Sequence, residues 1–184
     1  MVATRIVLLV DVFIVVLSFS ASWLAVGSSQ SQFPSGYTSF EVASMVGGYV
    51  GGQQGYPSNY LQNDYAAYVR TVVPPLIVGS WGLDVAIVLI PLAFVLTILS
   101  FSRWQFSLLA GALGATGSLL WIAGISAIAP EAAKRLESWP GFSGAVPQVT
   151  LSPSLGPYMA LVGGLSLLFT YFLTKAGKLD PPFE

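Results

Sequence analysis

Long apolar runs separated by polar stretches dominate the pattern of this chain. Four runs are long and apolar enough to cross a bilayer as helices, and they cover residues 6–27, 76–101, 106–129 and 155–174. About 20 helical residues span the hydrocarbon core, and backbone groups within lipid must be hydrogen-bonded inside their own segment. The pattern therefore predicts an all-α membrane protein, a bundle of four transmembrane helices in one domain.

The composition agrees with a membrane protein and narrows its chemistry. The chain has 184 residues, of which 54% are hydrophobic and only 8% are charged, against about 25% charged residues in a typical soluble domain. A net charge of −1 provides no basic surface for nucleic acid. The absence of cysteine and histidine removes the commonest metal ligands, thiol nucleophiles and the commonest general base. We therefore expect no enzymatic activity, cofactor, metal or nucleic-acid partner.

The basic residues predict how the bundle is oriented. Four spans put both termini on one side, and one group of cations shares that side: Arg5, Arg103, Lys175 and Lys178. The opposite side receives Arg70, Lys134 and Arg135. Positive charge collects on the cytoplasmic face. We expect cytoplasmic termini in the cell membrane, with residues 28–75 and 130–154 outside. Trp23 and Trp81 then fall at the outer boundary and Trp104 at the inner one, as in an aromatic belt.

The first outer loop, residues 28–75, is predicted to fold as a cap containing two short helices. Thr38 and Glu41 have the spacing of a capping box, so a helix is expected to start there and to stop at Gly47. The apolar positions between Ser58 and the Pro74–Pro75 pair follow helical steps. We expect that second helix to end before the prolines.

Tyrosine is concentrated in this cap, where six of the eight in the chain lie between residues 37 and 68. Tyrosine combines apolar area with a polar hydroxyl group, which suits interfaces. One interpretation is that these side chains pack the cap onto the bundle and the lipid headgroups. The other is a surface that binds a partner protein, with Tyr56, Tyr60, Tyr65 and Tyr68 as its candidates.

The second outer loop, residues 130–154, begins with a helical signal. Glu131 and Arg135 are an i, i+4 pair. The third helix is therefore expected to run one or two turns beyond the membrane or to continue as a short surface helix. Residues 145–154 are expected to return in an extended conformation.

Small residues recur at helical spacing in the last two spans. They are Gly111, Gly114 and Gly117 in the third span, and Gly156, Ala160 and Gly164 in the fourth. Such faces let helices in lipid approach closely. They are expected to pack within one bundle or, alternatively, against another subunit.

Two carboxylates lie well within the predicted spans, Asp11 and Asp84. An ionisable residue in a membrane is costly, and is therefore a candidate for proton or ion handling. The alternative for Asp11 is a neutral or hydrogen-bonded acid that either bridges helices or is hydrated near the inner boundary of the membrane. Asp84 is expected either to hold the start of the second span or to pair with an outer cation, namely Arg70, Lys134 or Arg135.

These features favour a non-catalytic structural or accessory subunit of a larger membrane assembly. Its expected partners are the lipid bilayer and other membrane protein subunits or a second copy of the chain, bound through the small-residue faces and the tyrosine-rich cap. One alternative is a small proton- or ion-conducting subunit that works through Asp11 or Asp84. A further alternative is a cell-surface adhesion or self-associating protein.

Overall fold

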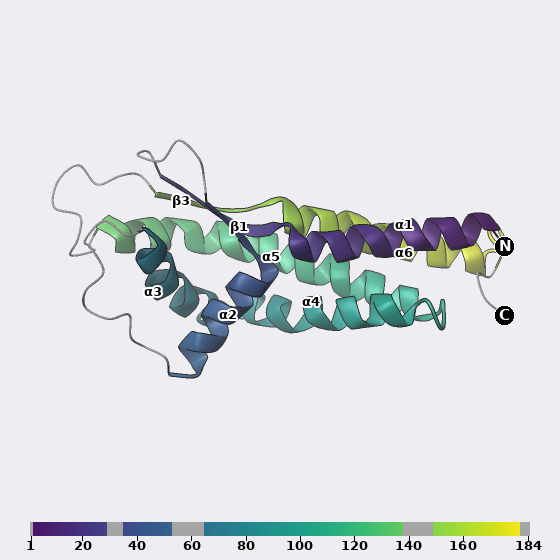
Figure 1. Cartoon of the computed structure of the whole chain (residues 1–184), viewed down its shortest axis with the longest axis horizontal. Coiled ribbons are helices and arrows are strands. Elements are labelled where there is room, and N and C mark those ends of the chain that lie inside the picture. Colours follow the sequence, from purple (N-terminus) through teal and green to yellow (C-terminus); the bar gives the residue numbers. More distant parts are fainter. Residues whose placement is uncertain (1, 29–34, 53–64, 138–148, 181–184) are drawn as a thin grey trace.

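The computed structural model describes residues 2–28, 35–52, 65–137 and 149–180. These residues form six helices and three short strands (Figure 1). In chain order the elements are α1 (Val2–Ser20), β1 (Ser22–Ser28), β2 (Ser35–Thr38), α2 (Ser39–Val50), α3 (Tyr65–Val78), α4 (Trp81–Leu99), α5 (Phe106–Glu137), β3 (Val149–Pro153) and α6 (Leu155–Lys175).

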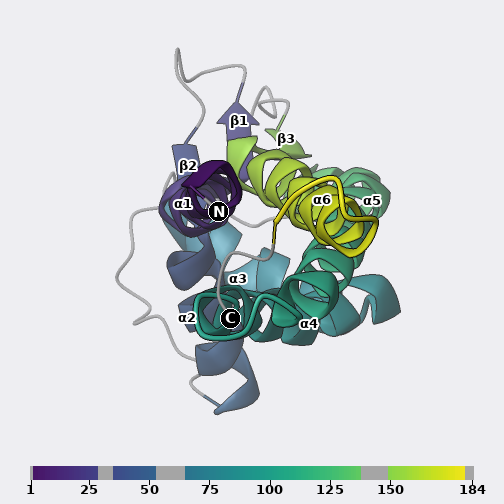
Figure 2. The same ribbon diagram turned by 90° about the vertical axis from the view of Figure 1, so that its right-hand side faces the viewer.

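Four long helices, α1, α4, α5 and α6, lie side by side as a bundle (Figures 1 and 2). The start of α1 and the end of α6 lie at the end of the bundle that also carries the short turn between α4 and α5 (Figure 1). Three of the helices are long and apolar enough to cross a membrane: Trp81–Leu99, Phe106–Arg135 and Leu155–Lys175. They indicate a multi-pass membrane protein, in agreement with three of the predicted runs.

The first predicted span, residues 6–27, is wrong in its second part. Helix α1 ends at Ser20, and the chain continues as strand β1. An all-α fold is therefore also wrong, because the described residues include a small sheet. The residues of β1 are apolar enough to continue the helix, so their hydropathy does not distinguish a strand from the last turns of a helix. Of the two strand partners of β1, one (Ser35–Thr38) follows it directly in the chain and the other (Val149–Pro153) is far away in the sequence, and pairing on both sides decides the outcome.

The sheet is antiparallel with the strand order β2-β1-β3, so β1 is bonded on both sides. Val26 pairs with Ser35 on one side and with Leu151 on the other. The strands come close at Gly27, where a Cβ atom would lie 2.6 Å from Thr150 Oγ1, so a larger residue there would require the threonine side chain to move. The sheet thus joins the end of α1 to the start of α6.

Helix α2 starts as predicted and ends later than predicted. Thr38 is its N-cap, and the reciprocal bonds of the capping box with Glu41 are both present. The helix passes Gly47 and continues to Val50, with Gly51 as the C-cap. Burial explains this, because Val46 on the same turn packs in the core and holds the helix past the glycine.

Helix α3 also continues past its predicted end. Pro74 and Pro75 lie inside it, and the chain breaks instead after Val78. Proline removes a backbone donor and strains the preceding turn, but the buried side chains of Val73 and Ile77 on either side hold this segment in the core. The second span accordingly starts at Trp81 rather than at residue 76.

Helix α5 is the longest helix among the described residues and supports part of the region formed by the sheet, α2 and α3. Its 32 residues extend over about 48 Å, against a hydrocarbon core of about 30 Å. It passes Pro130 as one helix, and Arg135 Nε donates to Glu131 Oε1 at 3.1 Å, which confirms the predicted pair. Helix α3 and strand β3 pack against α5 (Figure 1). Strand β3 agrees with the extended conformation expected for residues 145–154 as far as it is described, since residues 145–148 lie outside the described residues.

Candidate functional site

Asp11 lies inside the bundle, where α1 packs against α6. Its side chain is 2% exposed. Ser166 Oγ donates to Asp11 Oδ1 at 2.5 Å, and Thr170 Oγ1 donates to Asp11 Oδ2 at 2.8 Å. Both donors come from α6, one helical turn apart, so they reach the same carboxyl group from the same face. We refer to these three residues as the polar clamp.

The polar clamp determines what Asp11 is suited to do. A buried carboxyl group is costly unless its oxygens are hydrogen-bonded, and here each oxygen accepts a bond from a hydroxyl group of α6. The geometry matches the interpretation of Asp11 as an acid that bridges two helices. In this role it fixes the rotation of α1 about its axis relative to α6.

Asp84 lies apart from the clamp. It is exposed in the first turn of α4, where a negative charge is favourable beside the positive end of the helix dipole. Its backbone N–H donates to Ser80 O at 3.0 Å. Among the three cations considered as its partners, Arg135 pairs with Glu131, Lys134 is exposed with no ion pair to Asp84 among the described residues, and the side chain of Arg70 lies outside the described residues. Asp84 is exposed on α4, whereas Asp11 is buried against α6, so the two acids do not share one site.

The small residues of α5 and α6 meet within the bundle. A Cβ atom on Gly111 would lie 2.6 Å from Gly164 O, and one on Gly164 would lie 2.8 Å from Ala115 N. These distances are too short for a carbon atom, so the two backbones are in direct contact. Gly114 has more room, because a Cβ atom on it would lie 3.6 Å from its nearest neighbour, Ala93 Cβ.

The other small residues face neighbours within the same chain. A Cβ atom on Gly117 would lie 2.9 Å from Ile90 Cγ1 of α4. One on Gly156 would collide with the indole ring of Trp23. Ala160 is buried in the core. These residues therefore serve close packing inside one bundle.

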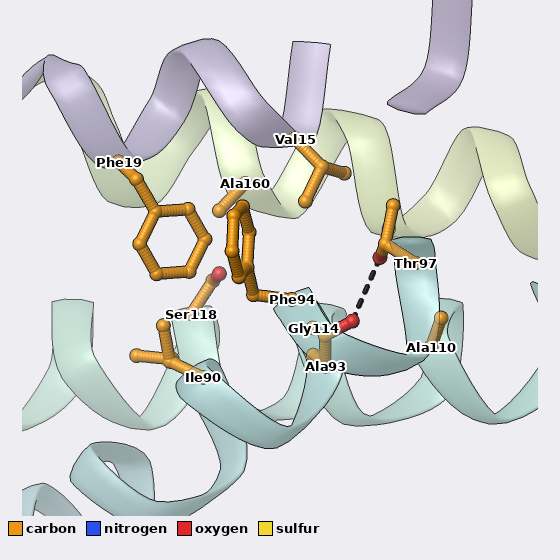
Figure 3. Close-up of a pocket in the computed structure, with 11 residues that line it drawn as sticks. Val15, Phe19, Ile90, Ala93, Phe94, Thr97, Ala110, Gly114, Ser118 and Ala160 are labelled. Carbon is orange, nitrogen blue, oxygen red and sulfur yellow. Dashed lines mark hydrogen bonds between the residues drawn. The ribbon is translucent and has the colours of Figure 1, made fainter. Parts of the chain in front are cut away.

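All four helices of the bundle line a small central cavity (Figure 3). Its volume is about 10 Å³, which is room for about one water molecule. Ser118 lines the cavity and is fully buried, and its Oγ has no hydrogen-bond partner among the described residues. Figure 3 shows this hydroxyl group pointing toward the rings of Phe19 and Phe94. Thr97, by contrast, donates to Ala93 O at 2.7 Å.

Trp23 connects the bundle to the sheet, and its predicted place in an aromatic belt is wrong. It is 1% exposed, and its Nε1 donates to Ser18 O at 2.6 Å. Its carbonyl oxygen accepts from Trp121 Nε1 at 3.1 Å and from Ser154 N at 3.2 Å. The two indole rings pack edge to face at 5.8 Å. The strand conformation of residue 23 turns this side chain into the core.

The remaining predicted aromatic residues have different surroundings. Trp81 is 77% exposed at the start of α4, and Trp104 packs against Tyr171 with ring centroids 5.2 Å apart. Of the tyrosines considered as a partner surface, Tyr56 and Tyr60 lie outside the described residues. Tyr65 and Tyr68 belong to α3, but their side chains lie outside the description as well.

Sequence reasoning missed Ser166 and Thr170 as partners of Asp11, and it missed Ser118. The signal for the first two was present: they are hydroxyl residues four apart in an otherwise apolar span, and an acid in another span needs donors. Hydroxyl residues in membrane helices often bond their own backbone instead, as Thr97 does. Their role therefore depends on which helices are neighbours.

Comparison of the sequence with models of protein families and with curated proteins finds no match. Among the described residues, no group of three or more acidic side chains is placed to hold a metal ion.

Proposed function

We propose that this protein is a non-catalytic structural or accessory subunit of a larger membrane protein assembly. The observation that carries the proposal is the folded outer region, in which the sheet, α2 and α3 are joined to an extension of α5 beyond the length of a membrane span. A helix that only needs to cross the bilayer does not require this extension. An ordered region at the membrane surface is suited to holding another protein at a fixed distance and angle.

The interior of the bundle supports the same proposal. The polar clamp ties the oxygens of Asp11 to hydroxyl groups, and the glycines of α5 and α6 pack against their own chain. The central cavity has room for about one water molecule. With the small-residue faces engaged within the bundle, the proposal assigns partner contact to the outer region, including the tyrosine-rich stretch with Tyr56, Tyr60, Tyr65 and Tyr68.

The proposal includes α1 as a fourth membrane span, with cytoplasmic termini and with residues 28–75 and 130–154 outside. The side chains that α1 turns outward are apolar, including Leu9, Val10 and Phe13, which are each more than half exposed. The buried side of the same helix carries Asp11. This distribution is the one expected of a helix that lies between lipid and protein.

The test is whether the intact protein holds a stoichiometric partner through its outer region. Membranes from the native source are extracted into lipid nanodiscs with an amphipathic polymer, and the complexes are resolved by native mass spectrometry. We expect one defined assembly that contains this chain at a fixed ratio. A protein found only as single copies or as random mixtures would overturn the proposal.

The rival function, proton or ion conduction through Asp11, is tested with the purified protein in liposomes. Asp11→Asn keeps the size of the side chain and removes its charge, and Asp84→Asn is the matched variant at an exposed position. We expect no flux above that of empty liposomes for the unchanged protein and both variants. A flux that Asp11→Asn abolishes and Asp84→Asn leaves intact would replace the proposed function by conduction.

A further inference from the structure

Helix α2 has three distinct sides. Val42 and Val46 are buried against the protein. Glu41 and Ser44 lie exposed on a second side. A third side is exposed and apolar, and its residues recur at steps of three and four: Phe40, Ala43, Gly47 and Val50. We call these four residues the α2 stripe.

The α2 stripe is too exposed for an ordinary water-facing helix side. Phe40 is 67% exposed and Val50 is 69% exposed. Single exposed apolar residues are common on soluble surfaces, whereas an ordered row of them on one helix side marks a contact with something apolar. The question is what that contact is.

The position of the stripe identifies lipid. Ser39 Oγ donates to Phe19 O at 3.0 Å, which ties the start of α2 to the end of α1. The ring of Phe40 lies 6.4 Å from the ring of Phe19. The outward side of α1 just before this point is apolar, with Phe13 62% exposed and Leu17 40% exposed. The stripe thus lies next to the outward apolar side of α1, with the exposed Ser20 at the end of α1 between them.

The orientation of α2 also fits the surface of a bilayer. Figures 1 and 2 show α2 oblique to the axis of the bundle and on one side of it. The polar side contains the capping box, in which Thr38 N donates to the exposed Glu41 carboxylate at 2.7 Å. A helix with one apolar and one polar exposed side is stable at the boundary between headgroups and acyl chains, about 5–10 Å deep on its apolar side.

We propose that α2 is an interfacial helix whose stripe is embedded in the headgroup–acyl boundary of the same bilayer that surrounds the spans. The helix carries no lysine or arginine, so the contact rests on apolar burial and does not require anionic lipid. This inference rests on α1 as a membrane span, which is part of the proposed function, and not on the role of the protein as a subunit. It gives the outer region a second attachment, which fixes its tilt over the membrane.

Spin labelling tests the proposal on the full-length protein in nanodiscs of phosphatidylcholine. The chain has no cysteine, so Phe40→Cys, Ala43→Cys and Val50→Cys each create one labelling site. Collision rates of the nitroxide with oxygen, which concentrates in lipid, and with a water-soluble nickel complex measure its surroundings. The lipid reference is Phe13→Cys, and the water reference is Lys178→Cys. Ser44→Cys is the matched control on the polar side of α2.

We expect the oxygen-to-nickel ratio at the three stripe positions to be several-fold higher than at residue 44 and close to that at residue 13. Adding anionic lipid should leave the ratios unchanged. A ratio at the stripe as low as at residue 178 would overturn the proposal in favour of water. Low collision rates with both reagents would overturn it in favour of a protein that covers α2, either a partner or a second copy.

Discussion

The contact between α5 and α6 at Gly164 leads to a sharp prediction. A Cβ atom at this position would lie 2.8 Å from Ala115 N and 3.0 Å from Gly111 O. Both neighbours are backbone atoms, which cannot turn away as a flexible side chain can. Gly164→Ala therefore forces the two helices apart. Reaching an ordinary separation of about 3.5 Å requires a shift of about 0.7 Å, and a gap of that size already loses a quarter or more of the dispersion energy between facing atoms.

The expected cost is about 1–3 kcal/mol, the range for over-packed cores. The matched control is Gly114→Ala on the facing helix, where the nearest atom to the added Cβ, Ala93 Cβ, is 3.6 Å away. Both substitutions gain about 1 kcal/mol of helix propensity, so this contribution cancels when the two variants are compared. The difference between them measures the steric contact alone.

Unfolding by SDS in mixed micelles provides the assay, followed through the fluorescence of the buried residues Trp23 and Trp121. We expect Gly164→Ala to unfold at a clearly lower SDS fraction than Gly114→Ala, by about 1–3 kcal/mol in the free energy of unfolding. Gly114→Ala should match or exceed the unchanged protein. Equal stability of the two variants would refute the direct contact between the backbones of α5 and α6.

Two further predictions use the same unfolding assay. Thr170→Val removes one donor to Asp11 at nearly constant volume and should lower the free energy of unfolding by about 1–2 kcal/mol. Ser118→Ala removes a hydroxyl group that has no partner among the described residues and should leave the stability unchanged or raise it. A larger loss of stability for Ser118→Ala than for Thr170→Val would contradict the polar clamp. Trp23→Phe keeps an aromatic ring but leaves a buried carbonyl group without its donor, and should cost about 1–3 kcal/mol; an unchanged midpoint would show that the indole bond is unimportant.

Local signals in the sequence predicted several elements correctly. The span at residues 155–174 agrees with α6, which ends one residue later, because a long apolar run in lipid has no alternative to the helix. The capping box of Thr38 and Glu41 also depends only on residues three apart, so the start of α2 was readable. The ion pair between Glu131 and Arg135 was predictable for the same reason, because the two residues are four apart in one helix.

Predicted helix ends were less accurate where burial opposed a local signal. Gly47 and the prolines of α3 were expected to stop helices, and both helices continue. The cost of a glycine or a proline is a few kcal/mol at most, and buried valines and isoleucines on the same turns offset it. Which residues are buried depends on the neighbours in three dimensions, and these are not visible in a window of the sequence.

The sequence by itself determined that this chain is mostly helical, belongs in a membrane and carries an isolated acid in an apolar run. Tertiary structure decided what those features do. Strand β1 is bonded on one side to β2, the next element in the chain, and on the other to β3 from a distant part of it. Trp23 is buried because β1 is a strand. Asp11 became a helix bridge because α6, and no nearer segment, presents two hydroxyl groups to it. Helical propensity and hydropathy act over a few neighbouring residues, whereas the pairing of β1 with β3 and the bonds of Asp11 join positions more than a hundred residues apart, and only the packed bundle selects among them.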